Sequence, residues 1–191
     1  MFVGLDLCQT NTHLMKKIFL LCMLCLLKFS NANAQTEVEP NGIWNQSLAI
    51  TLGNTADGSA GLGHEEDWWR VSIPEDGALT VNWQSNGFHL YCQIYDTLGT
   101  VVLFSNYTNG SSSGTASGIA KGTYYIRMVN YYPGEISNYT LTPSFTPAPV
   151  ANDAEPNGTF ATANTLPLNS TTTGHCHYYF NNEKDTLDWY T

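Results

Sequence analysis

The sequence has 191 residues and a formal net charge of −9, from 16 acidic and 7 basic residues. This length allows about one domain and part of another. The acidity argues against a nucleic-acid partner, because phosphates would be repelled, and it suits a soluble exported protein or one that binds cations.

The N-terminal part predicts a cleaved secretory signal peptide. A basic pair precedes an apolar run from Ile18 to Leu27, and the small-x-small pattern Ala32-Asn33-Ala34 predicts cleavage after Ala34. The run is shorter than the about 20 residues of a membrane span, so we expect residues 1–34 to be removed; an uncleaved anchor is the alternative. Residues 1–14 are unusually polar for a signal, and we expect translation to start at Met15.

Cysteine usage predicts no disulfide framework. Only Cys92 and Cys176 follow the expected signal, and Cys92 lies in an alternating apolar segment, which indicates a buried, inert thiol. Zinc binding by His175, Cys176 and His177 is not favoured. Strand alternation sends the cysteine to the face opposite the histidines, and structural zinc ligands usually have two or more residues between them.

Short alternating strands are predicted in chain order over residues 67–141. The expected strands are Asp67–Ile73, Ala78–Trp83, Phe88–Tyr95, Thr100–Phe104, Thr123–Val129 and Tyr139–Leu141. Turn residues separate them, and the Asn-, Ser- and Gly-rich stretch 106–118 is expected to be an exposed loop. This pattern predicts an all-β fold, a two-sheet antiparallel β-sandwich.

Two motifs recur at nearly the same spacing. Glu39-Pro40-Asn41-Gly42 is repeated 116 positions later from Glu155, and Asp67-Trp68-Trp69 is matched 121 positions later from Asp188. This period is the length of a domain. We therefore expect a complete domain at 35–145, a proline-rich linker at 146–152, and at 153–191 the beginning of a second copy whose remainder lies downstream.

The order of these motifs resembles the bacterial pre-peptidase C-terminal domain family, which has relatives in clostridial collagenases. The matching stretches are Glu39–Gly42, Gly61–Gly63, Asp67–Val71, Leu90–Thr100, Gly122–Arg127 and Tyr139–Leu141. The resemblance implies a jelly-roll-like β-sandwich that is a non-catalytic accessory module of secreted peptidases and other exported enzymes. The collagenase relatives bind collagen and hold calcium near the domain's N-terminus, so the resemblance also implies these two properties. Gly42 and Gly158 depart from the family, since many members have Asp there.

The repeated motif also predicts a cation site on chemical grounds. In an extended segment, side chains at alternate positions share a face, and their carboxylate and amide oxygens are ligands that calcium prefers. The expected ligands in the first copy are Glu37, Glu39, Asn41, Glu65 and Asp67, with Glu66 as a further candidate. Those in the second copy are Asp153, Glu155, Asn157, Asp185 and Asp188. The alternative is that both motifs are ordinary turns with solvated acids.

Catalysis is not expected in this stretch, because the sequence contains no G-x-S-x-G, H-E-x-x-H or phosphate-binding glycine loop. Tyr131 and Tyr132 stand in a predicted loop, and we expect one of them to contact an extracellular protein or a polysaccharide.

The sequence therefore indicates a secreted or cell-surface bacterial accessory module that is linked covalently to downstream domains. We expect it to assist an associated hydrolase, by binding or as a spacer. Calcium is the expected cofactor, and neither nucleic acid nor a membrane span is expected. Two alternatives stay open. The chain is the N-terminal part of a secreted peptidase whose catalytic domain lies beyond Thr191, or it belongs to a repeat-built adhesin.

Overall fold

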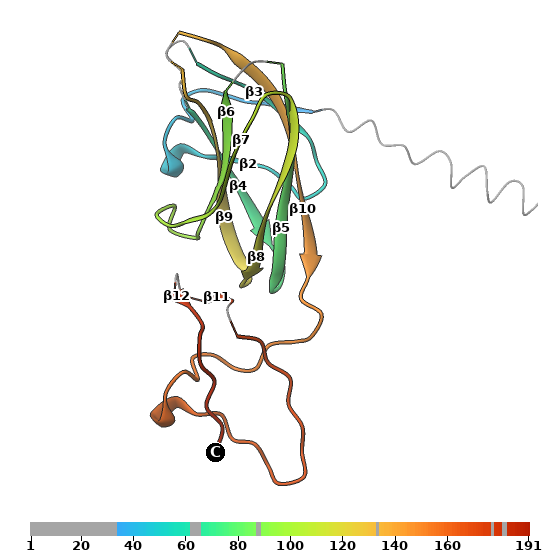
Figure 1. Cartoon of the computed structure of the whole chain (residues 1–191), viewed down its shortest axis with the longest axis vertical. Coiled ribbons are helices and arrows are strands. Elements are labelled where there is room, and N and C mark those ends of the chain that lie inside the picture. The colour runs from blue at the N-terminus through green and yellow to red at the C-terminus, as the bar shows by residue number, and fades with distance from the viewer. Residues whose placement is uncertain (1–33, 62–65, 87–88, 133, 177, 181–182) are drawn as a thin grey trace, which may run out of the picture. The chain divides into compact units, whose positions relative to one another are not determined.

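The computed structural model describes residues 34–191, except 62–65, 87–88, 133, 177 and 181–182 (Figure 1). The signal-peptide prediction falls on residues 1–33 and lies outside the described part of the chain. Within that part, no helix is long and apolar enough to cross a membrane.

Two β-sheets form the fold, and Figure 1 shows their long strands side by side. The order of the first sheet is β1 (Gln35–Thr36), β3 (Ala56–Ala60), β10 (Ser137–Pro147), β5 (Gly77–Ser85), β8 (Ser111–Ile119), β11 (Tyr179–Phe180) and β12 (Glu183–Lys184). The order of the second is β2 (Leu48–Ala49), β4 (Glu66–Ile73), β9 (Gly122–Asn130), β6 (Leu90–Tyr95) and β7 (Val102–Thr108).

Long strands pair antiparallel, whereas the two-residue strands β1 and β2 pair in parallel with β3 and β4. Two short 3-10 helices complete the regular structure of the described residues, η1 (Trp44–Gln46) and η2 (Phe160–Thr162). The predicted all-β sandwich is thereby confirmed.

The core lies between the facing sheets and follows the alternation in the sequence. Trp69, Val71 and Ile73 of β4 are buried, as is every second residue of β5 from Leu79 to Trp83. Each large apolar side chain removed from water contributes about 1.5–3 kcal/mol. Cys92 is fully buried in this core, burial raises the pKa of its thiol, and both Cys92 and Cys176 are free. The prediction of a buried thiol without a disulfide is confirmed.

The prediction of a loop at 106–118 is wrong. The chain there forms the end of β7 and most of β8, which pairs along its length with β5. The buried positions of β8 include Gly114 and Ala116, and a Cβ atom on Gly114 would lie 2.0 Å from the Phe104 ring. A side chain from β7 thus fills the space that a larger residue of β8 would take. The Asn109-Gly110 turn, a common hairpin signal, is the local clue.

The last strand of the sandwich is longer than the sequence predicts. We expected Tyr139–Leu141, but β10 extends to Pro147 and so enters the segment expected to be a linker. Beyond Leu141 this strand pairs only with β5 and no longer with β3. Proline is tolerated there because one side of the strand is not part of a ladder.

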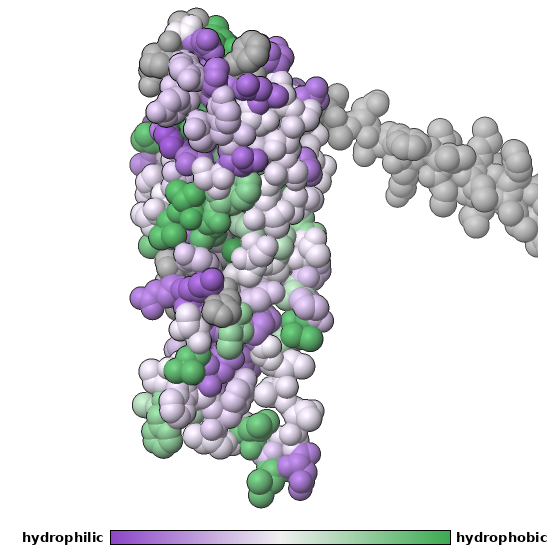
Figure 2. Space-filling view, viewed as in Figure 1, coloured by the Kyte–Doolittle hydropathy of each residue, from purple (hydrophilic) through white to green (hydrophobic). Residues whose placement is uncertain are grey.

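The outer face of the molecule mixes hydrophilic and hydrophobic residues, and Figure 2 shows hydrophobic ones at the level of the β6–β7 turn. Leu98 and Val102 are exposed there. Trp44 of η1 covers the same turn, since a Cβ on Gly99 would lie 3.2 Å from its ring. Gly99 has a φ of +68°, a conformation that favours glycine.

Candidate metal centres

The segment before η1 is fixed to both sheets by backbone bonds. Glu37 N donates to Asp57 O of β3 at 3.0 Å, and Trp68 N of β4 donates to Asn41 O at 3.0 Å. The Glu39–Pro40 peptide between these attachments is cis. The first copy of the repeated motif therefore spans from one sheet to the other.

Three of the predicted ligands come together in this segment and β4. Glu37, Glu39 and Asp67 each present a carboxylate oxygen, and these oxygens all lie within 4.8 Å of one another. Asp67 is fully buried, and the Glu37 carboxylate accepts a bond from Ser59 N at 2.7 Å. Glu65 lies outside the described residues.

Glu66, the further candidate, is not part of this cluster. Alternation along β4 turns it away from Asp67, and its carboxylate pairs with Arg127. Trp68 Nε1 also donates to Glu66 at 3.3 Å. The acid next to the site therefore serves a surface ion pair.

Burial shapes the protonation of the first cluster. The pKa of Asp67 is raised to about 8, chiefly because burial removes water from its carboxylate, and the nearby Glu37 charge adds to the effect. Burial also raises the pKa of Glu37. Glu37 Oε2 and Asp67 Oδ1 accept no hydrogen bond from another described residue, and the two carboxyls interact with each other, so that they can share a proton. When that proton is lost, the two buried charges are costly, and a cation between them would offset that cost.

Two buried hydrogen bonds in series hold Asp67 Oδ2 in place. Tyr139 Oη donates to Asp67 Oδ2 at 2.7 Å, and Trp69 Nε1 donates to Tyr139 Oη at 2.8 Å. Gly58 makes room for this arrangement, because a Cβ there would lie 2.3 Å from Tyr139 Oη. These two bonds orient the carboxylate, and they do not involve Oδ1.

Asn41 is fully buried, whereas Glu39 beside it is exposed. Its backbone N–H donates to Glu39 Oε2 at 2.9 Å. Its side-chain amide lies 3.1 Å from both Glu39 carboxylate oxygens when Nδ2 faces them. The opposite orientation of the amide would bring three oxygens together, which is favourable only around a cation.

The second copy repeats this local structure. Asn157 is fully buried, its N–H donates to Glu155 Oε2 at 3.0 Å, and Trp189 N donates to Asn157 O at 3.1 Å. The Glu155–Pro156 peptide is cis, like its counterpart. The parallel β-bridge between Asn164 and Tyr190 corresponds to the parallel pairing of Leu48 with Trp69 in the first copy.

Acids gather in the second copy as well. Asp153, Glu155 and Asp188 present oxygens within 4.8 Å of one another. Burial raises the pKa of Glu155, and the negative charges of Asp185, Asp153 and Asp188 raise it further. Four buried oxygens have no partner among the described residues: Asp153 Oδ1, Glu155 Oε1, Asn157 Oδ1 and Asp188 Oδ1. Four of the five predicted ligands are thus adjacent.

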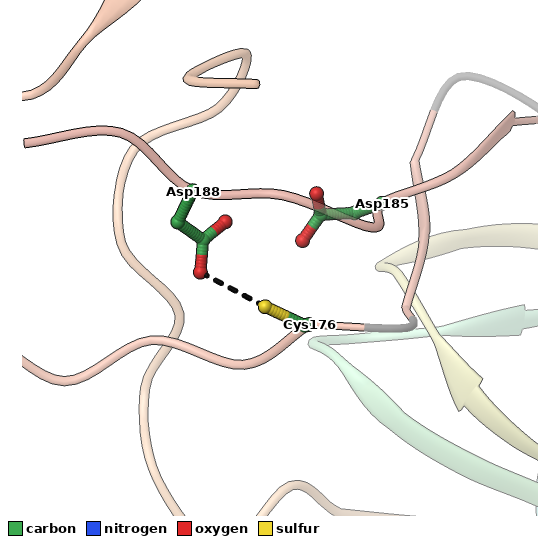
Figure 3. Close-up of side chains that lie close together, drawn as sticks. All are labelled: Cys176, Asp185 and Asp188. Atoms are coloured by element: carbon green, nitrogen blue, oxygen red, sulfur yellow. Dashed lines mark hydrogen bonds between the residues drawn. The ribbon is translucent and has the colours of Figure 1, made fainter. Parts of the chain in front are cut away.

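Asp185, the fifth, belongs to a neighbouring cluster that the sequence did not suggest. It lies with Asp188 and Cys176, and their ligand atoms are within 4.8 Å of one another (Figure 3). His175 is not included. Its Nε2 lies 3.7 Å from Asp76 Oδ2, and its ring contacts Tyr178. His177, the other histidine of the triplet considered for zinc, lies outside the described residues.

The predicted contact tyrosines lie on the surface. Tyr131 and Tyr132 have exposed fractions of 67% and 46%. Their rings are part of a larger aromatic group in which centroids are 4.0–5.7 Å apart, formed with His89, Tyr91 and Tyr107. Sequence alternation could not reveal this group, because its members come from β6, β7 and the segments that precede β6 and follow β9.

No protein-family model matches the sequence, and a search of curated proteins found no match. Among solved structures, the pre-peptidase C-terminal domain of a collagenase from Bacillus anthracis is 15% identical, with 56% of this chain and 100% of that chain covered and a TM-score of 0.45. PliG, a periplasmic inhibitor of g-type lysozyme from Aeromonas hydrophila, is 14% identical, with 52% and 99% covered and a TM-score of 0.34.

A β-glucosidase from Paenibacillus barengoltzii is 17% identical over 60% of this chain, has a TM-score of 0.30, and is covered over only 12% of its own length. These likenesses are distant, so the functional argument rests on the residues of this chain.

Proposed function

We propose that the chain is a secreted or cell-surface, non-catalytic accessory β-sandwich module of an exported bacterial protein, linked to further domains and stabilised by calcium. It would assist an associated hydrolase, either by binding a target or by acting as a spacer between domains. One observation carries the calcium proposal: the fully buried Asp67 carboxylate, with an unpartnered oxygen, lies against the carboxylates of Glu37 and Glu39.

The ligand chemistry of the first cluster favours calcium over other common cations. Its donors are carboxylates, with the Asn41 amide oxygen available when the amide turns, and none is sulfur or imidazole. Calcium takes about 6–8 oxygens in flexible geometry, whereas magnesium demands near-octahedral geometry. Water would supply the remaining ligands. The second copy offers similar oxygens through Asp153, Glu155, Asn157 and Asp188.

Calcium binding itself is the direct test. We expect calorimetric titration of the full chain with calcium to show binding that Glu37→Gln weakens at least tenfold at one site, because a carboxylate ligand is lost. Asp57→Asn is the matched control, since Asp57 lies in neighbouring β3 and outside the cluster. Equal titrations for the wild-type chain and Glu37→Gln would contradict the proposal.

The aromatic group favours a binding role in addition to spacing. Tyrosine presents an apolar ring with a polar tip and is common where proteins contact sugars or other proteins. Here the exposed rings of Tyr131 and Tyr132 continue into those of Tyr91 and Tyr107, so that a ligand would meet several rings at once. We propose this face as the contact for an extracellular protein or a polysaccharide.

We expect the full chain to be retained on immobilised collagen or on an insoluble polysaccharide such as cellulose or chitin. The double substitution Tyr131→Ala/Tyr132→Ala should lower the bound fraction several-fold, because tyrosine is enriched among the few interface residues whose truncation costs roughly 2 kcal/mol or more. Leu168→Ala, at a residue that is 95% exposed, is the control for loss of surface apolar area. Retention on none of these materials would indicate a spacer.

The peptidase and adhesin alternatives remain distinct proposals. The coding sequence downstream of Thr191 separates them: a catalytic motif would support the N-terminal part of a peptidase, and further Glu-Pro-Asn-Gly repeats alone would support an adhesin.

A further inference from the structure

The second copy carries an insertion that the first copy lacks. Gly58 and Gly174 are equivalent positions, because they stand 116 residues apart and a Cβ on either would lie 2.7 Å from a carboxylate oxygen of the first predicted ligand of its own copy. Asp67 follows Gly58 by nine positions, whereas its counterpart Asp188 follows Gly174 by fourteen. The insertion of five residues therefore lies between Gly174 and Asp188.

This stretch contains two short strands that join the second copy to the first. β11 and β12 pair antiparallel with each other, and β11 pairs in parallel with the end of β8, where Tyr179 is opposite Ile119. Ala120 N donates to Tyr179 O at 3.0 Å. The Tyr179 side chain packs against the hydrophobic core of the sandwich, and Ile119 is fully buried. β11 thus pairs with an edge that would otherwise present unpaired backbone groups at the end of β8.

The linker between the copies is attached near both of its ends. Ala148 N donates at 2.8 Å to the backbone oxygen of Asp76, in the turn between β4 and β5. Further along, His175 N donates to Asn152 Oδ1 at 3.0 Å, and the imidazole Nε2 of the same histidine lies 3.7 Å from Asp76 Oδ2. The His175 side chain is 9% exposed. The turn, the linker and the second copy therefore meet at one end of the sandwich.

We propose that the insertion is a docking element, which holds the second copy in one orientation against the end of the first. The surface that receives it is the end of β8 together with the turn at Asp76. Domains joined by a linker and a small interface ordinarily move relative to one another. Here the described residues from Ala34 to Thr191 form one compact unit. The inference rests on the proposed spacer role, since a docked pair of copies keeps a fixed distance between the parts that it joins.

Amide hydrogen exchange of the full chain, followed by NMR, tests the docking. We expect the Ala120 amide to be protected in the wild-type chain. Tyr179→Ala should lower this protection at least tenfold, because the ring that holds β11 against the core is lost. The amides of Trp68 and Trp189 report on each copy alone, since each donates to the motif of its own copy, and their exchange should not change.

Phe160→Ala is the matched control. It also removes an aromatic ring from the second copy, but Phe160 is 74% exposed and contacts Trp189 of the same copy, so the Ala120 protection should stay as in wild type. An unprotected Ala120 amide in the wild-type chain would overturn the proposal, and so would protection that Tyr179→Ala leaves unchanged.

Backbone NMR relaxation of the unmodified chain does not depend on any variant. Both copies should report one rotational correlation time, and a separate, shorter time for residues 153–191 would refute the docking. That result would leave the calcium titration and the retention of the full chain on collagen or polysaccharide as expected, so a failure of the docking can be told apart from a failure of the proposed function.

Discussion

Millimolar calcium is expected to raise the melting temperature of the full chain by roughly 5–10 °C, and Glu39→Ala is expected to remove most of that rise. A ligand that binds only the folded state stabilises it by about 2.7 kcal/mol at a hundredfold excess over its dissociation constant. For a protein of this length, each kcal/mol corresponds to about 2–4 °C. Differential scanning calorimetry with calcium, and then with a chelator, measures the difference.

Glu39 is the informative position because its removal acts through different contacts in the two conditions. With calcium, the variant loses a ligand of the cluster formed with Glu37 and Asp67. Without calcium, it loses the acceptor of the buried Asn41 N–H, so the chelated variant should be less stable than wild type, although the loss of a negative charge beside Glu37 and Asp67 offsets part of that cost. Glu75→Ala, in an exposed turn, is the control. A wild-type chain that calcium does not stabilise would refute the expectation.

The calcium-free protein is expected to lose stability as pH rises from 5 to 8. The pKa of Asp67 is raised by burial to about 8, well above the value of about 3.9 for an exposed Asp. Between these values the folded state holds a proton that the unfolded state has released, so raising the pH favours unfolding. The stabilisation is complete below about pH 4 and lost above about pH 8. Urea unfolding at several pH values, with a chelator, measures this slope.

Calcium should flatten the same pH dependence, because a cation holds the carboxylates of the cluster in their ionised form. The apparent calcium affinity should consequently increase from pH 5 to 8, as protons no longer compete. Asp67→Asn removes the titrating group but keeps an acceptor for Tyr139, so it should reduce the slope without calcium. Stability of the chelated wild-type chain that increases over this range would contradict the assignment.

Much of the fold follows from residues that are neighbours in the sequence. Alternation in β4 and β5 identified buried Trp69 and Leu79, and turn residues marked the strand ends. The strand β8 was missed because its buried positions are small and Phe104 of β7 occupies the space above Gly114. That complementarity joins two strands and leaves no periodic apolar signal in either one.

The candidate sites likewise combine residues that the sequence pattern predicts with residues that come from distant parts of the chain. Recurrence and alternate spacing pointed to Glu37 and Glu39, and the acid that begins the next core strand, Asp67, lies with them. The support from Tyr139 comes from a residue far along the chain, and no local pattern reveals it. Cys176 likewise meets Asp188 only because the chain returns after β12, and its own spacing to the neighbouring histidines suggested a different and poorer site.

The attachment of the first motif has a mechanical consequence. Where the N-terminal segment is retained as an uncleaved anchor, tension would enter the sandwich through residues 35–41, which are held by the backbone bonds from Glu37 to Asp57 and from Trp68 to Asn41. These few bonds would peel one after another under load. A cation that joins Glu37 and Glu39 to Asp67 makes the segment and β4 yield together, so calcium would set the force at which the domain begins to open.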